Sequence, residues 1–298
     1  MFEARNSVSQ KMTNPETAVD SLAFDVSIVS FSEDTEQLKL TLNSTAVALN
    51  RLCKIDHRLT PRITIVNNRC NEDMDSEEFR HLLASLADAE IGLSIIQGHG
   101  NIGYGKAHNL AFKTDQVGYH LFLNPDVEVD EDALSVGLDY LEAFPEVGMV
   151  SPSAIGPKGQ KQFLCKRFPA IFDLFLRGFM PHAVKAFFSR RLARYEMQEL
   201  SDSEPASGIP IVSGCFMLCR SQPLAEVKGF DPEYFLYFED FDLSLRLGAI
   251  SNIAYLPDMK IRHWGGQSAN KGLWHIVQFV RSGVRFYSRH GWRWFKTG

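Results

Sequence analysis

The sequence lacks the features that define several classes of protein. Its five cysteines are scattered and include no Cys-x-x-Cys pair, which argues against a zinc site and fits a reducing compartment. It also has neither the GxGxxG fingerprint of dinucleotide-binding proteins nor the GxxxxGK[ST] loop of nucleoside triphosphatases. We therefore expect a cytoplasmic protein whose chemistry depends on other motifs.

A membrane-spanning segment is also missing. The longest uncharged apolar run, residues 208–219, is far shorter than the roughly 20 residues that a spanning helix needs. Residues 1–20 are polar and lack the apolar core of a secretory signal, so we expect them to form a flexible leader. Any contact with a membrane is expected to be peripheral.

Charge is unevenly distributed along the chain. The net charge of −5 argues against nucleic acid as a partner of the whole molecule. No acidic residue follows Asp258, and in this tail four arginines recur every four residues next to apolar residues at helical spacing: Arg281, Arg285, Arg289 and Arg293 next to Ile276, Val280, Val284 and Tyr287. This pattern predicts a basic amphipathic helix over residues 271–298 that lies on a membrane surface. The alternative is a solvated arginine face on a helix that packs against the core.

The first half of the chain alternates between strand and helix patterns. Strands are predicted at residues 24–31, 63–66, 91–96 and 120–123, and helices at 77–88, 106–112 and 130–144. This rhythm predicts an α/β fold with a mostly parallel sheet and helices on both faces. Polar or glycine-rich turns follow the strands at residues 30–34, 67–71, 100–105 and 124–126. Ligands bind beyond the carboxyl ends of such strands, so we expect the site there.

Residues 229–246, the acid–aromatic segment, combine a turn, the aromatic residues Tyr234, Phe235, Tyr237 and Phe238 after it, and a cluster of acids. Glu239, Asp240 and Asp242 directly precede an apolar run that is typical of a helix. Backbone N–H groups and the helix dipole favour negative charge at a helix start, which suits a general base. The alternative is an ordinary capped helix behind a buried aromatic loop.

Two other motifs carry residues that can bind a ligand or a metal. Asn124-Pro-Asp126 ends a predicted strand, and its carboxylate could bind a hard cation, although the same residues favour a plain turn. His263 follows a strand predicted at residues 253–256, and together with Asp126 it would form a site for Mg²⁺ or Mn²⁺. The glycine-rich segment from Asn101 to Asn109 leads into a helix and is either an anion-binding loop or a tight turn.

Together these motifs resemble the family-2 glycosyltransferases of the GT-A fold, in particular the bacterial rhamnosyltransferases that build O-antigen and related polysaccharides. The resemblance covers residues 25–287. The motifs that carry it are Asn101-Ile-Gly-Tyr-Gly with Asn109, Leu123-Asn-Pro-Asp126, Ser213-Gly-Cys-Phe-Met217, Gly229-Phe-Asp231, Phe235-Leu-Tyr-Phe-Glu-Asp-Phe-Asp-Leu243 with Arg246, and His263. The resemblance implies a Rossmann-like GT-A domain over residues 21–270, with a nucleotide-sugar half at 21–150, an acceptor and catalytic half at 151–270, and a helical extension on the acceptor side.

The resemblance also assigns roles to individual residues. It implies that Asp240 is the catalytic base, that Glu239, Tyr237 and Trp264 contact the acceptor, and that Asp126 and His263 hold the metal. The donor site would comprise Ser30, Phe31, Asn67, Asn101, Gly103, Gly105, Asn109, Asn124 and Asp126. Two positions depart from the family pattern, because Asn124 and Asn67 stand where relatives usually have an acid. The departures weaken the expected metal affinity and the expected recognition of the donor's base.

The resemblance implies an inverting, metal-dependent transfer of L-rhamnose from dTDP-L-rhamnose to a lipid-linked or polysaccharide acceptor. A polyprenyl-diphosphate-linked saccharide would place the protein at the inner face of the cell membrane. A donor such as a UDP-hexose or UDP-galactofuranose, or a non-catalytic nucleotide-sugar binding protein, is the alternative. A nucleotidyltransferase is disfavoured, because residues 30–34 lack the glycine-rich loop that such enzymes carry after the first strand.

Overall fold

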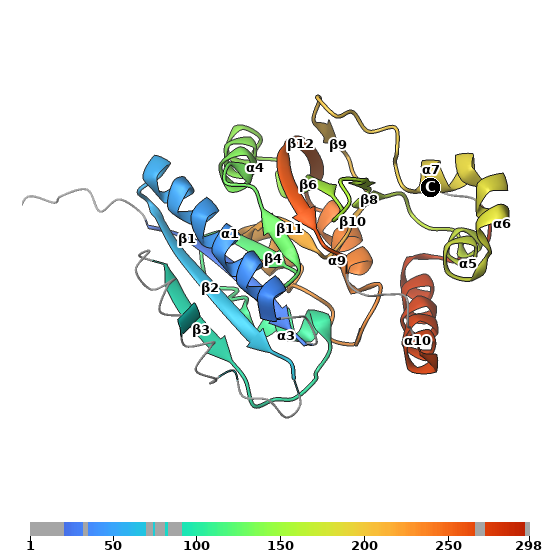
Figure 1. Cartoon of the computed structure of the whole chain (residues 1–298), viewed down its shortest axis with the longest axis horizontal. Coiled ribbons are helices and arrows are strands. Elements are labelled where there is room, and N and C mark those ends of the chain that lie inside the picture. Colours follow the sequence, from blue (N-terminus) through green and yellow to red (C-terminus); the bar gives the residue numbers. More distant parts are fainter. Residues whose placement is uncertain are drawn as a thin grey trace, which may run out of the picture.

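The structure, a computed structural model, describes residues 21–31, 35–69, 74, 81–82, 91–265 and 272–295. Within these residues ten strands form one mixed sheet in the order β3-β2-β1-β4-β11-β6-β12-β5, with β7 beside β6 and β9 beside β12 (Figure 1). The strands are β1 (Leu22–Ser30), β2 (Leu59–Asn67), β3 (Gly92–Ile96), β4 (Gly118–Leu123), β5 (Val127–Val129), β6 (Val147–Ile155), β7 (Lys161–Gln162), β9 (Ala206–Ser207), β11 (Phe216–Arg220) and β12 (Asn252–His263). A two-stranded sheet pairs β8 (Cys165–Lys166) with β10 (Ile211–Val212).

Helices cover both faces of the sheet, as the alternating pattern predicted. Apolar side chains of α1 (Thr35–Ile55) and α4 (Ala133–Ala143) pack on one face, where Ile28 and Leu123 belong to the same buried cluster. On the opposite face Val29 packs against α3 (Tyr104–Ala111), and Phe122 packs with α8 (Ser221–Glu226) and α9 (Glu239–Gly248). Successive strand residues point to opposite faces, so apolar strands of this kind require both layers.

The carboxyl ends of the first strands lie together, which positions the site. Strands β3, β2, β1 and β4 are parallel, and the register aligns Ser30 with Asn67 and Ile28 with Leu123. The backbone N–H of Asn68 donates to the carbonyl of Ser30 at 2.8 Å, and its side-chain nitrogen donates to Asn101 Oδ1 at 3.1 Å. Three of the predicted polar turns are therefore joined directly.

The second half of the chain departs from the expected strands. The sequence from residue 210 to 219 is mostly apolar and predicts a single strand, but the structure has two strands there, β10 and β11, because the intervening Ser213 and Gly214 bond to Leu164 and Asp240. β11 runs antiparallel between β4 and β6. The strand expected at 253–256 continues to His263 as β12, and the register against β6 shifts between Leu256 and Lys260, where Pro257 can donate no hydrogen bond. The expected leader and helix 77–88 lie outside the described residues, apart from positions 81 and 82.

Four helices form a group beside the acid–aromatic segment: α5 (Ile171–Phe179), α6 (His182–Phe187), α7 (Ser189–Tyr195) and α10 (Leu273–His290) (Figure 1). Phe286 and Tyr287 of α10 are buried in an aromatic cluster with Phe168, Tyr234 and Phe238. The predicted helix in the tail is therefore present as α10, but it ends at His290, and residues 291–295, which were also expected to be helical, are not. None of the helices in the described ranges is long and apolar enough to cross a membrane.

Candidate active site

The start of α9 brings two acids and a strained loop together. The helix begins at Glu239, and Tyr237 and Phe238 before it adopt φ values of 72° and 66°. Such left-handed conformations cost energy for large side chains and occur where the surrounding structure imposes them. Here Phe238 is held in the aromatic cluster with α10. The conformation of this loop therefore orients the start of α9, which carries Glu239 and Asp240.

Two backbone N–H groups hold the carboxylate of Asp240. Gly214 N–H donates to Oδ2 at 2.9 Å, and Phe241 N–H donates to Oδ1 at 2.9 Å. Burial raises the pKa of Asp240, while these hydrogen bonds act in the opposite direction because they favour the charged form. Gly214 precedes β11, so the conformation of that turn orients the acid.

Glu239 lies beside Asp240 in a different environment. It is buried, and its Oε2 atom has no hydrogen-bond partner among the described residues. Burial, and after it the negative charge of Asp240, raises the pKa of Glu239. The pair therefore shares one proton over a range of pH, and the two N–H donors on Asp240 favour the charge on that residue and the proton on Glu239.

Asp126 and His263 lie next to each other because β5 and β12 pair in antiparallel fashion. The pairing sets His263 opposite Val127, and Trp264 N–H donates to the carbonyl of Asp126 at 2.9 Å. His263 Nε2 is 3.5 Å from Asp126 Oδ1, and its other ring nitrogen contacts Gln162 Oε1 at 2.7 Å. The Asp126 Oδ1 atom is buried without a hydrogen-bond partner in the described part of the chain.

These two residues suit a divalent cation. A histidine that donates from one ring nitrogen to an amide oxygen presents the other nitrogen as a ligand, and the Asp126 oxygen offers a charge beside it. Among the described residues no group of three or more His, Cys, Asp or Glu side chains could hold a metal on its own. A cation here would therefore need further ligands from a substrate or water, as Mg²⁺ commonly does.

Tyr104 connects the metal residues with the acid pair. Its hydroxyl donates to the carbonyl of Gly214 at 2.6 Å, and the same oxygen lies 3.0 Å from Asn124 Oδ1. Burial raises its pKa well above the usual value, and the nearby charges of Glu239, Asp240 and Asp126 act in the same direction. Tyr104 thus lies near all three acids, although they come from two distant parts of the sequence. The sequence reasoning missed Tyr104, which it treated only as part of a glycine-rich turn.

The residues predicted for the donor fall into two groups. Ser30 and Asn67 are buried at the ends of β1 and β2, and Phe31 beside them is 49% exposed. Asn101 Oδ1 accepts from Gly103 N–H and from Asn68, so it shapes the turn at the same edge. These four residues and Asn124 lie at or near the carboxyl ends of the strands, where the sequence placed the donor.

Gly103, Gly105 and Asn109 instead hold the acid–aromatic segment. A Cβ on Gly103 would lie 2.3 Å from the carbonyl oxygen of Phe235, and one on Gly105 would lie 2.8 Å from Phe230 Cβ. Asn109 donates to the Phe230 carbonyl at 2.7 Å and accepts from the Phe230 N–H at 3.0 Å. The two glycines and Asn109 therefore allow or make contacts within the protein, which explains them without a ligand.

The expected acceptor residues Tyr237 and Trp264 flank the site on different elements. The Tyr237 hydroxyl contacts His275 Nδ1 of α10 at 2.9 Å. Trp264 follows the metal-binding candidate His263, and its indole N–H is buried without a partner among the described residues. Trp264 is therefore the better placed of the two to donate a hydrogen bond to a bound molecule.

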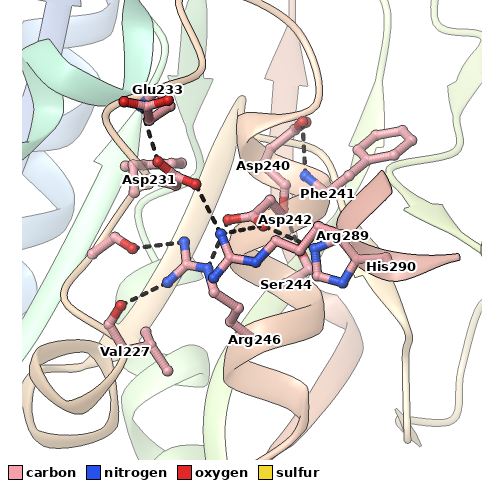
Figure 2. Close-up of polar contacts among 12 residues, drawn as sticks. Val227, Asp231, Glu233, Asp240, Phe241, Asp242, Ser244, Arg246, Arg289 and His290 are labelled. Atoms are coloured by element: carbon pink, nitrogen blue, oxygen red, sulfur yellow. Dashed lines mark hydrogen bonds and ion pairs between the residues drawn. The ribbon is translucent and has the colours of Figure 1, made fainter. Parts of the chain in front are cut away.

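An ionic network joins the acid–aromatic segment to α9 and α10 (Figure 2). Asp242 is fully buried and accepts from Arg246 at 2.6 Å and from His290 at 2.8 Å, with Arg289 at 3.3 Å. Arg285 and Arg289 both reach Asp231, at 3.0 and 2.8 Å. Two of the four arginines predicted to face a membrane or solvent therefore pair with acids of the same protein.

Comparison with known proteins supports one class of enzyme. No family model matches the chain. The chain is 28% identical over 220 residues to the N-acetylglucosaminyl-diphospho-decaprenol L-rhamnosyltransferase of Mycobacterium tuberculosis. This alignment covers 66% of this chain and 70% of that protein. The chain is also 29% identical over 195 residues to the rhamnosyltransferase WbbL of Escherichia coli, covering 61% of this chain and 68% of that protein.

Solved structures share the fold at low sequence identity. A structure of GalNAc-T7 with UDP, GalNAc and Mn²⁺ aligns with a TM-score of 0.60 at 14% identity, covering 90% of this chain and 48% of that one. The mannosyltransferase PcManGT from Pyrobaculum calidifontis, solved with GDP-Man and Mn²⁺, gives 0.53 at 15% identity and covers 88% and 64%. Taken with the sequence relatives and the acid pair at the start of α9, this fold identifies the chain as a glycosyltransferase of the GT-A fold, similar to bacterial rhamnosyltransferases.

Proposed function

We propose that this glycosyltransferase inverts the anomeric centre as it transfers L-rhamnose from dTDP-L-rhamnose to a saccharide linked to a polyprenyl diphosphate. One observation carries the proposal. Tyr104 links Asp240 with the Asp126–His263 pair: its hydroxyl hydrogen-bonds to Gly214, whose N–H holds Asp240, and it lies 3.0 Å from Asn124, two residues before Asp126. A general base and a candidate cation site at that proximity suit a displacement of a nucleoside diphosphate.

The acid pair divides the work on the acceptor. Asp240 removes the proton from an acceptor hydroxyl as its oxygen forms a bond to the anomeric carbon. The bond from that carbon to the diphosphate oxygen breaks on the opposite side, and the nucleoside diphosphate leaves with the electron pair. Protonated Glu239 can donate a hydrogen bond to the acceptor, which orients the hydroxyl toward Asp240.

Asp126 and His263 are the residues that would hold Mg²⁺ or Mn²⁺, and Asn124 lies beside them. When bound, the cation supplies positive charge that offsets the charge of the diphosphate. The unpartnered Asp126 oxygen supports this assignment, as does the orientation of His263 by Gln162.

The names of the relatives support the choice of donor and acceptor. The mycobacterial protein is named for L-rhamnose transfer to a decaprenol-diphosphate-linked acceptor. We carry both substrates to this chain as a proposal, together with work at the inner membrane surface, where such acceptors reside. The alternatives are transfer from a UDP-hexose or UDP-galactofuranose, and nucleotide-sugar binding without transfer.

A transfer assay with matched variants tests the proposal. The purified protein would be given dTDP-L-rhamnose or a UDP-sugar, with Mg²⁺ or Mn²⁺, and an acceptor linked to polyprenyl diphosphate. We expect dTDP-L-rhamnose to be used, and Asp240→Asn to lower turnover by about 10²–10⁴-fold while dTDP binding survives. EDTA and Asp126→Ala should both lower turnover.

Other outcomes would redirect the proposal. Turnover of Asp240→Asn near that of wild type would remove Asp240 from the role of base. Faster use of a UDP-sugar would replace the donor and leave the chemistry in place. If the protein binds nucleotide sugars but neither transfers the sugar to an acceptor nor hydrolyses the donor, the non-catalytic alternative would be favoured.

A further inference from the structure

Helix α10 has an inner face that is bound to the catalytic segment. Phe286 is fully buried, and Ser282 donates to the carbonyl of Leu236 at 2.8 Å. Arg285 reaches Asp231 of the loop, and Figure 2 shows Arg289 and His290 beside Asp231 and Asp242. The helix is therefore anchored along one side, and its opposite side is not covered by the residues that the structure describes.

The outer face of α10 carries an apolar stripe, defined as Leu273, Ile276, Val277, Val280 and Val284. Their exposed fractions are 76%, 38%, 53%, 54% and 50%. At about 100° per residue these five positions fall within roughly 100° of arc, so they form one continuous band along the helix. Single exposed apolar residues are ordinary, whereas a band of five that the described part of the chain leaves exposed indicates a partner surface.

The surroundings of the stripe are basic and aromatic. Arg281 flanks it, is exposed, and makes no ion pair with the described residues, unlike Arg285 and Arg289. No acidic residue follows Asp258 in the sequence. Exposed tryptophans stand near both ends of the helix, Trp274 at 48%, Trp292 at 49% and Trp294 at 59%. Tryptophan is enriched at the boundary between lipid and water, where its ring and its N–H both find suitable surroundings.

We infer that the apolar stripe of α10 docks on the surface of an anionic lipid bilayer, with the exposed tryptophans at the level of the headgroups. The inference rests on the proposed function, because docking on a bilayer would bring the enzyme to a lipid-linked acceptor. It differs from the membrane helix expected from the sequence in one respect. The contacting face is the valine and leucine stripe, whereas Arg285 and Arg289 face inward and hold the catalytic segment.

The charge pattern favours lipid over a second copy of this chain. A dimer through the stripe would bring two Arg281 side chains toward one another with no acidic residue of α10 to pair with them, since the helix has none. Anionic headgroups match the flanking charge of Arg281 instead.

Vesicle co-sedimentation of the full chain tests the inference. The vesicles would contain phosphatidylglycerol in one series and only phosphatidylcholine in the other. We expect the double variant Val277→Glu/Val280→Glu to bind phosphatidylglycerol vesicles at least about tenfold more weakly than wild type. Val47→Glu is the matched control, because Val47 is 52% exposed on a different helix, α1, and should bind as wild type. Leu273→Ser serves as a second, milder variant should the double variant fail to fold.

The outcomes separate the inference from the proposed function. Wild type that fails to bind phosphatidylglycerol vesicles, or variants that bind like wild type, would overturn the docking surface. A wild-type dimer in sedimentation velocity that the double variant dissolves would assign the stripe to a second copy. In the expected case the double variant transfers sugar to a soluble acceptor at the wild-type rate and loses transfer to acceptor embedded in vesicles. If wild type transfers no sugar at all while the stripe variants still lose vesicle binding, the docking surface stands and the proposed function fails.

Discussion

Glu239 and Asp240 are neighbours in the chain, yet the fold gives their carboxyl groups different environments. Asp240 receives two backbone N–H donors, whereas one oxygen of Glu239 is buried without a partner among the described residues. Hydrogen bonds favour the charged form and burial disfavours it, so Glu239 keeps its proton to higher pH. A base and an acid thus arise from adjacent residues of similar chemistry.

The pH dependence of turnover should report Asp240. Its raised pKa means that activity is lost, as pH falls, at a pH above the ordinary range of a carboxyl group. Glu239 is already protonated in that range, so Glu239→Gln should lower turnover and leave the acidic limb of the profile in place. Rate measurements across pH under saturating donor would check both points. If the acidic limb of the pH profile of Glu239→Gln lay one pH unit or more below that of wild type, the assignment of the proton to Glu239 would be contradicted.

Glu239 should also lower the stability of the protein at alkaline pH. Its folded-state pKa is raised above the unfolded value, so the folded state binds more protons between the two values. The free energy of unfolding therefore falls as pH rises through that window, by at most roughly 1.4 kcal/mol per pH unit. Glu239→Gln should be more stable than wild type, with a gap that grows from weakly acidic to alkaline pH. Thermal unfolding measured at several pH values tests this, and a gap independent of pH would contradict it.

At the scale of elements, α3 holds the acid–aromatic segment through one amide side chain. Asn109 satisfies both the N–H and the carbonyl of Phe230. Asn109→Ala would leave these two backbone groups without partners and should destabilise the protein by roughly 2–4 kcal/mol, and lower turnover through a loosened loop. Denaturant unfolding measures the change. Asn43→Ala, at an exposed position on α1, is the control and should lie within about 0.5 kcal/mol of wild type. Wild-type stability in Asn109→Ala would show that the clamp contributes nothing.

Helices α9 and α10 meet at Asp242, which has no exposed surface and is surrounded by three basic side chains. Asp242→Asn removes the charge that these groups share and should cost about 3–5 kcal/mol, because the largely buried Arg246 then lacks a charged partner. Asp139→Asn on α4, where the side chain is exposed, should be close to neutral. Chemical denaturation of both variants decides the point. A small effect of Asp242→Asn would mean that the network tightens α10 without stabilising the fold.

At the scale of the whole molecule, the donor edge and the acid pair of the site are positioned by different kinds of contact. The donor edge follows from parallel strands whose carboxyl ends align, as Ser30 aligns with Asn67. The acid pair reaches that edge only because the acid–aromatic segment is fastened at Gly103, at Asn109 and along α10. This arrangement couples the catalytic acids to the helix that carries the apolar stripe, so docking and catalysis share one element.

Much of the fold and part of the candidate site could be predicted from the sequence, and the contacts that were missed have identifiable physical causes. Strand and helix periodicity predicted the alternating first half, and the acids before an apolar run predicted the start of α9 at Glu239. Tyr104 and Gly214 were missed because their contacts, a hydroxyl to a carbonyl and an N–H to a carboxylate, join segments more than 25 residues apart. Asn109 was expected to face the donor, since an amide side chain gives no sign of whether it bonds to ligand or to backbone.

The sequence by itself determined which residues share a strand or a helix face, because backbone geometry repeats with a known period. It thereby placed acids at a helix start and polar residues at strand ends. Together with the resemblance of the motifs, these placements were enough to predict the class of enzyme. Only the tertiary structure decided which face of each element is covered. The arginines and valines of α10 lie on one amphipathic helix, but the acids at positions 231, 233 and 242 draw Arg285 and Arg289 inward and leave the apolar stripe outside. That outcome depends on contacts between distant segments, which no local pattern encodes.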